Sequence, residues 1–297
     1  MSASHLIRLY SGVSFRYPSP QDNDSAHYAL KNVSFTLKPS SLTVIVGQNG
    51  SGKSSLARLL TGLCQPNTGE ILVDGVKTSF YKRSDLSQAT ASLTQDHRLF
   101  PLTIAENIGL GDHGSRHNMG LIREAASLGG AANFIDKLAD RYEHSLASLK
   151  TCFRMGELPE GPLADFANGF QMSAMVSGGE KQRLVAARTF MRLLSPRTKL
   201  VVADEPSAAI DPIGEYELFE KLREHRTGKT MVFISHRFGY LTKLADQILC
   251  MKDGELVEVG THIELMALGG EYRKLYDVQA KAFVNSDEDL LASGSAS

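Results

Sequence analysis

The fold of this chain is decided by the stretch Gly47-Gln48-Asn49-Gly50-Ser51-Gly52-Lys53-Ser54, which fits the pattern GxxxxGK[ST]. The apolar run LTVIV at 42–46 precedes it. The leucines that follow it recur at the spacing of one buried helix face, at Leu56, Leu59, Leu60 and Leu63. A glycine-rich loop between a buried strand and a helix is the context that identifies a P-loop. The sequence therefore predicts a phosphate-binding loop here.

The predicted loop has the chemistry that a nucleoside triphosphate requires. Glycines let the backbone wrap closely around phosphates, and amide N–H groups at the start of the helix point toward them. We expect Lys53 to neutralise the β- and γ-phosphates and the Ser54 hydroxyl to ligate Mg²⁺. Residues 47–54 and the adjoining Ser55 are therefore assigned to nucleotide binding, with ATP and Mg²⁺ as cofactors.

Acidic residues follow a second apolar strand candidate, LVVA at 200–203. Asp204 at its end suits a second magnesium-site group, and Glu205 is placed to act as general base toward the attacking water. The alternative is a buried strand that simply ends in acidic residues at the surface. A P-loop in the same chain favours the magnesium-site interpretation.

Two further polar residues follow strand candidates. His236 comes directly after TMVFIS at 230–235. A lone histidine there is more often structural, but a position on the same sheet edge as Asp204 favours a γ-phosphate contact. Gln95 follows a short apolar segment, and glutamine is usually a surface residue. Here it could reach Mg²⁺ and the water.

A second glycine-bearing segment, Ser177-Gly178-Gly179-Glu180, lies just ahead of a helical stretch. Ser177 and Glu180 have the S-x-x-E spacing of a capping box. Two glycines at a helix N-terminus also make an anion cradle. The structural and the functional interpretations can hold together.

Strand candidates alternate with helical patterns along the chain, which predicts an α/β fold with a parallel sheet and a ligand site at the carboxyl ends of its strands. Short alternating runs over 6–46 predict a small N-terminal antiparallel β subdomain. Asp74-Gly75 and Asp253-Gly254 each separate short apolar segments, which favours two-residue hairpins.

The chain divides on the same patterns into one domain and a tail. Between about 97 and 175 the strand signals stop and helical stretches alternate with glycine-rich loops. We therefore expect a domain over 1–280, whose core covers 1–94 and 196–280 and whose helical subdomain covers about 95–195. The small and polar tail 281–297 is expected to be disordered.

Composition limits the possible partners and surroundings. The net charge of −1 in 297 residues gives no general attraction to nucleic acid, so no nucleic-acid partner is expected. The cysteines Cys64, Cys152 and Cys250 are widely separated and are interpreted as reduced thiols. No apolar stretch approaches the roughly 18 residues of a membrane-spanning helix. We expect a chain that is soluble by itself.

The ordered motifs resemble those of the ATP-binding cassette (ABC) ATPases. The P-loop, Gln95, the signature VSGGE at 176–180, LVVADE at 200–205 and His236 occur in that family's order. The resemblance covers about residues 6–280. It implies that Tyr17, in FRYP, stacks on adenine and that Asp211, in the segment SAAID, faces a partner subunit. It also implies that two cassettes pair head to tail, so that the signature of one closes on ATP held by the other.

Two segments are similar to ABC exporters in particular, LFPLTIAENIGLG at 99–111 and the stretch 253–279. This similarity implies a transmembrane domain or subunit as partner and a place on the cytoplasmic side of a membrane, peripheral through that partner. The segment before the signature departs from the exporter pattern, because GFQMSAM at 169–175 stands where Gly-Glu-Arg-Gly is usual.

Three functions compete on this pattern. The first is an ATPase that drives transport as a homo- or heterodimer of cassettes, which the exporter-like segments favour. The second is a non-transport ABC ATPase acting on nucleic acid or ribosomes, which the near-zero charge and the lack of long heptads disfavour. The third is a cassette that binds ATP without hydrolysis. Intact Lys53, Asp204, Glu205 and His236 argue against it.

Overall fold

The computed structural model of the chain describes residues 8–18, 28–93, 98–146, 176–204, 212–235 and 239–280. Contacts divide the chain into two compact units. The first is made of Met1–Ser92, Lys199–Glu205 and Arg226–Ser297, and the second of Leu93–Thr198 and Pro206–His225. The sequence predicts that 206–225 belongs to the core, whereas the contacts place these residues in the second unit. The single domain over 1–280 stays a prediction. The tail 281–297 lies outside the described residues.

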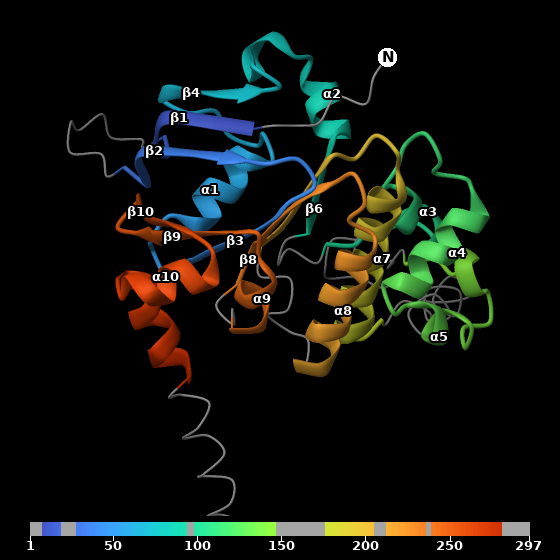
Figure 1. Cartoon of the computed structure of the whole chain (residues 1–297). Helices are drawn as coiled ribbons and strands as arrows, with labels where there is room; N and C mark the ends of the chain where they lie inside the picture. The colour runs from blue at the N-terminus through green and yellow to red at the C-terminus, as the bar shows by residue number, and fades with distance from the viewer. Residues whose placement is uncertain are drawn as a thin grey trace, which may run out of the picture. The chain divides into compact units, whose positions relative to one another are not determined.

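A 6-stranded sheet in the first unit runs in the order β10-β9-β3-β8-β7-β6 (Figure 1). Its strands are β3 (Leu42–Gly47), β6 (Thr90–Leu93), β7 (Leu200–Asp204), β8 (Thr230–Ile234), β9 (Gln247–Lys252) and β10 (Glu255–Gly260). β3 pairs in parallel with β8 and β9, and β7 pairs in parallel with β8. Every residue of β3 and β8 is buried, as continuous apolar runs require. The predicted parallel sheet is confirmed.

A 4-stranded antiparallel sheet in the same unit has the order β2-β1-β4-β5. Its strands are β1 (Arg8–Phe15), β2 (Leu30–Leu37), β4 (Thr68–Val73) and β5 (Val76–Lys77). Both predicted hairpins are present, because Asp74-Gly75 joins β4 to β5 and Asp253-Gly254 joins β9 to β10. All four turn residues have positive φ, between 50° and 84°, as a type I′ turn requires.

Helix α1 (Lys53–Leu60) lies between the two sheets (Figure 1). Leu56, Leu59 and Leu60 are at most 1% exposed, and they join both sheets in one hydrophobic core. The prediction for Leu63 is wrong, since this side chain is 63% exposed. The helix ends before Leu63 because Gly62 takes a left-handed conformation with φ 74°.

The remaining elements of the first unit are short. They are the 3₁₀ turn η1 (Thr78–Phe80), α2 (Arg83–Gln88), α9 (Gly239–Leu244), α10 (His262–Leu268) and a helical stretch over 271–280. The carboxylate of Glu258 on β10 accepts hydrogen bonds from the backbone N–H groups of Glu271 and Tyr272. This side chain therefore ties the start of the last helical stretch to the sheet.

The described part of the second unit is helical, as the sequence predicted. Its elements are α3 (Ile104–Gly109), α4 (Met119–Leu128), α5 (Ala132–Ile135), the 3₁₀ turn η2 (Arg141–Glu143), α7 (Gly178–Leu194) and α8 (Pro212–Glu224). The guanidinium of Arg188 on α7 donates to the backbone and side-chain oxygens of Asn107, each at 2.8 Å. Asn107 is fully buried and also bonds the backbone of Phe100, so the two side chains fix the segment before α3 to α7.

Candidate nucleotide-binding site

The P-loop follows the central strand β3, as predicted, and the strand register places the acidic end of β7 close to it. Ile45 of β3 pairs with Ile234 of β8, and Ile234 pairs on its other side with Asp204. Neighbouring strands lie about 4.8 Å apart, so Asp204 is roughly 10 Å from Ile45 across the sheet. Asp204 and the P-loop therefore share the carboxyl-terminal edge of the sheet.

Two glycines of the P-loop occupy places that no larger residue can fill. A Cβ at Gly52 would lie 2.6 Å from the Ala29 carbonyl oxygen, and the φ of Gly52 is 99°. A Cβ at Gly47 would collide with the carbonyl of Met251. The loop therefore packs against the start of β2 on one side and against β9 on the other. These two contacts fix the curved conformation of the loop.

Lys53 places its ammonium inside the loop. The side chain is 5% exposed, and Nζ donates to the carbonyl oxygens of Gly47 and Gln48, each at 2.8 Å. These bonds fold the lysine back over the backbone that precedes it. A positive charge is therefore fixed at the start of α1, where the helix dipole also favours an anion.

The start of α1 keeps its backbone donors for a ligand. Its N-cap residue is Gly52, and no side chain caps the helix. The hydroxyl oxygen of Ser51 is buried and has no hydrogen-bond partner among the described residues. Uncapped N–H groups and a buried hydroxyl without a partner are what a bound phosphate group would satisfy. These residues fit a phosphate ligand.

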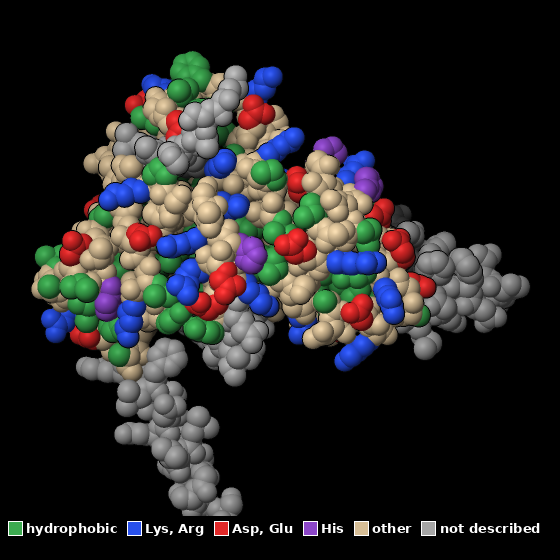
Figure 2. Space-filling model, turned by 45° about the vertical axis from the view of Figure 1, so that its right-hand side comes forward, with side chains coloured by type: hydrophobic (Ala, Val, Ile, Leu, Met, Phe, Trp, Pro, Cys, Tyr) green, Lys and Arg blue, Asp and Glu red, His purple; other side chains and the backbone are tan. Residues whose placement is uncertain are grey.

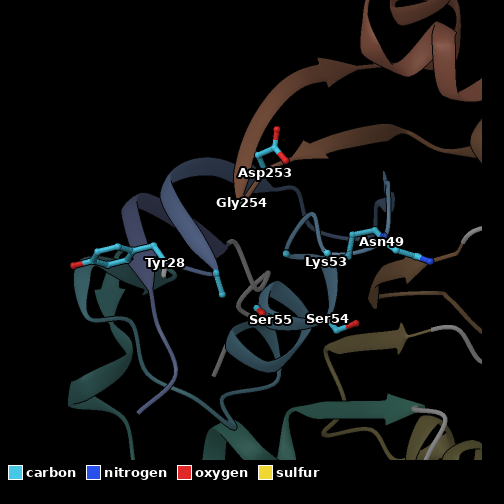
Figure 3. A pocket seen from close by; sticks show the side chains of 10 residues that line it. Tyr28, Asn49, Lys53, Ser54, Ser55, Asp253 and Gly254 are labelled. Carbon is cyan, nitrogen blue, oxygen red and sulfur yellow. The ribbon is translucent and has the colours of Figure 1, made fainter. Parts of the chain in front are cut away.

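A pocket of ≈ 330 Å³ opens over this helix start (Figure 3). It is lined by Tyr28, Ala29, Asn49, Gly50, Gly52, Lys53, Ser54, Ser55, Asp253 and Gly254. Five of these ten residues belong to the predicted P-loop, and Ser55 adjoins it. Three parts of the chain that are distant in sequence therefore form one cavity, namely the start of β2, the P-loop and the β9–β10 turn.

The magnesium ligands expected from the sequence are in part described. Ser54 lines the pocket beside Lys53, and Asp204 ends β7 on the same edge of the sheet. Hydroxyl and carboxylate oxygens are the ligands that Mg²⁺ takes in nucleotide sites. Ser54 and Asp204 therefore fit a magnesium ion held at the phosphates. Gln95, the third expected ligand, lies outside the described residues.

Tyr17, which the family resemblance assigns to adenine, is held by contacts within the protein. Its hydroxyl is 3.1 Å from the hydroxyl of Ser55, and the guanidinium of Arg58 lies 5.5 Å from its ring centroid. The edge-to-face ring of Phe15 is 4.9 Å away. Tyr17 is 41% exposed but does not line the pocket.

The predicted signature forms the start of α7 in the second unit. Ser177 is the N-cap, and its hydroxyl accepts a hydrogen bond from the N–H of Glu180 at 3.3 Å. The Glu180 carboxylate accepts the Ser177 N–H in return at 2.7 Å, so the predicted capping box is confirmed. The Ser177 N–H that donates to this carboxylate is the main cause that lowers the pKa of Glu180 below its usual value. Gly178 and Gly179 have open space where a Cβ would stand.

Several residues predicted to act in the site cannot be placed. Glu205, Asp211 and His236 lie outside the described residues, as does the segment before the signature. The roles assigned to these residues therefore stay predictions.

The structure adds two features that the sequence patterns did not assign to the site. Tyr28 lines the pocket from the start of β2, and Asp253-Gly254 lines it from the β9–β10 turn. The Asp-Gly pair was recognisable as a hairpin, but its place behind the P-loop depends on the pairing of β9 with β3. No local pattern marks Tyr28.

Comparisons with known proteins agree with this geometry. A family model described as ABC transporter matches residues 30–208. The nisin transport ATP-binding protein NisT of Lactococcus lactis subsp. lactis is 32% identical over 277 residues, which cover 93% of this chain and 41% of that protein. The ATP-dependent lipid A-core flippase of Pseudomonas aeruginosa is 34% identical over 274 residues, with 91% and 40% covered.

A solved structure is also similar. It is described as a bacterial Atm1-family ABC exporter with ATP bound, and it matches with a TM-score of 0.74 at 27% identity, over 94% of this chain and 43% of that one. The chain therefore spans about two fifths of the length of these three proteins.

Proposed function

This chain belongs to the ABC transporter family, and we propose that it is the ATP-binding and ATP-hydrolysing motor of an exporter. Family membership implies ATP binding and ATP hydrolysis in general. The observation that carries the proposal is the uncapped start of α1 with the buried Lys53 ammonium inside the P-loop. The exporter role is supported by relatives that are named as a flippase and as a nisin transporter.

Residues of the P-loop bind and orient the triphosphate in this proposal. The N–H groups at the start of α1 donate to phosphate oxygens, and Lys53 neutralises the β- and γ-phosphates. Ser54, Asp204 and Gln95 hold Mg²⁺. When bound, this ion supplies positive charge that offsets the charge on the phosphates.

The proposed hydrolytic step needs residues beyond the P-loop. Glu205 accepts a proton from the attacking water as general base, and His236 contacts the γ-phosphate. Both follow strands whose ends share the edge of the sheet with the P-loop, since Asp204 and Ile234 pair directly. That placement supports the assignment of both residues to one site.

The proposed exporter also requires a second cassette and a transmembrane partner. The signature at Ser177–Glu180 of one cassette closes on ATP held by the other, and Asp211 faces the partner cassette. Closure and reopening would move a transmembrane domain or subunit. None of the described helices is long and apolar enough to cross a membrane. We propose that the chain lies on the cytoplasmic side, peripheral through that partner.

Nucleic acid is not proposed as a partner. On the face drawn in Figure 2, described basic and acidic side chains are interspersed rather than gathered by sign. Binding to nucleic acid relies on clustered basic residues that contact phosphates.

The test is the solution mass of a Glu205→Gln variant, measured by light scattering with and without Mg-ATP. Loss of the general base is expected to trap ATP between two cassettes, so that the mass doubles only when Mg-ATP is present. A Glu205→Gln, Lys53→Ala double variant is the control and should stay monomeric. A mass unchanged by bound ATP would contradict self-pairing of this chain. Undiminished ATP hydrolysis in Glu205→Gln would contradict the role of the base.

A further inference from the structure

The helical stretch over 271–280 has no role in the proposed function, yet it is bonded to the strand that supports the P-loop. We propose that Glu271, at its start, is a positioning residue for ATP binding, which acts on the P-loop through Lys252 and the β9–β10 turn. Glu271 does not line the pocket. This inference rests on the proposed nucleotide-binding function and deepens it, because it names an element outside the pocket that controls the affinity for ATP.

The start of the stretch 271–280 is fixed to β10 and to α10. The Glu258 carboxylate of β10 accepts hydrogen bonds from the backbone N–H groups of Glu271 and Tyr272. Such groups at the start of a helix have no partner within the helix, so a carboxylate there stabilises it. The Tyr272 side chain is fully buried, and its hydroxyl lies 2.7 Å from Nδ1 of His262 on α10. These bonds determine where Glu271 lies relative to the β9–β10 hairpin.

An ion pair connects this helix start to the end of β9. Nζ of Lys252 donates to the carboxylate of Glu271 at 3.1 Å. This bond is the main cause that raises the pKa of Lys252 above its usual value. The Glu271 side chain is only 14% exposed, and salt screens a partly buried pair less than an exposed one. The pair therefore links the stretch to the last residue of β9.

The end of β9 and its turn contact the P-loop at two places. Gly47 pairs with Met251 in the register of β3 and β9, and a Cβ at Gly47 would collide with the Met251 carbonyl. The Gly254 N–H donates to the Ser51 carbonyl at 3.2 Å, and Figure 3 shows this turn beside the P-loop. Lys252 lies between these two contacts in the sequence. A shift of Lys252 therefore changes the support of the P-loop.

Positioning and direct electrostatics predict opposite results for one substitution. Glu271→Gln removes a negative charge. If that charge acted directly on the phosphates, its loss would strengthen ATP binding. If Glu271 positions the turn, its loss releases Lys252 and weakens ATP binding. We expect the affinity to fall about threefold, the size of effect that a partly exposed ion pair can supply.

The coupling must also act in the reverse direction, because linkage between two equilibria is reciprocal. ATP should therefore stabilise the docked stretch in the parent chain. The backbone N–H groups of Glu271 and Tyr272 report on docking, since both are bonded to Glu258. Their protection from hydrogen exchange should rise by about the same factor, roughly threefold, when ATP is bound. This measurement requires no variant.

The experiment is equilibrium dialysis of the full chain with labelled ATP in EDTA. The variants are Glu271→Gln, Glu258→Ala, which releases the helix start, and the matched control Glu70→Gln. Glu70 pairs with Lys77 at 2.7 Å in the antiparallel sheet and lies outside the pocket. Its loss also removes one carboxylate, but ATP affinity should stay within about 1.5-fold because distant exposed charges are screened. Circular dichroism verifies the fold of each variant.

Steady-state hydrolysis of Mg-ATP separates positioning from a general loss of structure. Glu271→Gln should raise KM for ATP by about the factor lost in affinity and leave kcat unchanged, because the residues proposed for the hydrolytic step are intact. A fall in kcat with an unchanged KM would contradict the inference.

The outcomes separate this inference from the proposed function. Weaker ATP binding in Glu271→Gln and Glu258→Ala, unchanged binding in Glu70→Gln and protection of the two N–H groups by ATP support the inference. Unchanged or tighter binding in Glu271→Gln overturns it, and so does hydrogen exchange that ATP does not affect. These results leave ATP binding by the parent chain intact. If the parent chain does not bind ATP, the proposed function fails, and this inference fails with it.

Discussion

The starts of α1 and α7 are both rich in glycine, yet they are built in opposite ways. At α1 the N-cap is Gly52, and no side chain caps the backbone donors. At α7 the N-cap is Ser177, which forms a reciprocal capping box with Glu180. One helix start is left open for an anion, whereas the other is closed by its own side chains.

The difference shows that glycines at a helix start do not by themselves make an anion site. At α1 the buried Lys53 ammonium adds positive charge to the open donors. At α7 the Glu180 carboxylate places a negative charge at the donors instead, and the Ser177 N–H that it accepts lowers its pKa. A phosphate that approaches the start of α7 therefore meets the negative charge of the Glu180 carboxylate, which is already bound there.

The largest expected effect is the removal of the P-loop cation. Lys53→Met should lower kcat for ATP hydrolysis by about 100-fold or more, because a fixed positive charge at the transferring phosphate is lost. Steady-state phosphate release measures it. Lys181→Met, which removes a lysine from the first turn of α7, is the matched control and should stay within about twofold. Equal losses in both variants would contradict the contrast between the two helix starts.

The next effect comes from adding one methyl group to each glycine-bearing loop. Gly52→Ala should lower the free energy of unfolding by about 2 kcal/mol, because its φ of 99° is strained for alanine and the Cβ meets the Ala29 carbonyl. ATP affinity should fall with it. Gly178→Ala has open space and should change stability by less than about 0.5 kcal/mol. Urea unfolding of both variants measures the two changes in stability. Similar unfolding midpoints would be evidence that the P-loop is no more crowded at Gly52 than α7 is at Gly178.

Removal of the cap at α7 should have a smaller effect. Ser177→Ala removes the acceptor for the Glu180 N–H and should cost about 1 kcal/mol of stability. Ser177→Asp keeps an acceptor and should retain most of that stability. ATP affinity of the monomer, measured by equilibrium dialysis, should be the same in both variants. A fall in monomer affinity would show that this helix start contributes to the site in the same chain.

The smallest effect is a pH dependence at Glu180. Its pKa is lowered in the folded chain, so its charged form stabilises the fold above the usual carboxylate pKa, and this stability is lost as the pH falls through the lowered value. Glu180→Gln can keep the bond to Ser177 without the charge. The parent chain should therefore have a free energy of unfolding about 0.5 kcal/mol above that of the variant at pH 7, and urea unfolding should show a smaller difference at pH 3. A difference that is the same at both pH values would refute the charge effect.

Local patterns predicted the parts of the fold that local interactions determine. The P-loop context, the two Asp-Gly hairpins and the capping box at Ser177 each depend on residues that are neighbours in sequence. The prediction for Leu63 is wrong because helical spacing alone does not account for Gly62, whose left-handed conformation ends α1. A glycine at that position was the available signal.

The composition of the pocket was harder to predict. Tyr28 and Asp253-Gly254 reach the P-loop through pairings across the fold, such as the bond from Lys31 N–H to the Gly254 carbonyl. No spacing within the sequence encodes such a contact. The site was therefore predictable where one loop builds it, but not where several strands converge on it.

The β9–β10 turn has a consequence for the synthesis of the chain. The Gly254 N–H donates to the Ser51 carbonyl at 3.2 Å, and β3 pairs with β9. A ribosome makes the P-loop motif long before it makes these supports. A nascent chain that ends before β9 carries the motif without the strand and turn against which the loop packs. The P-loop can therefore take this supported form only after β9 and its turn have been synthesised.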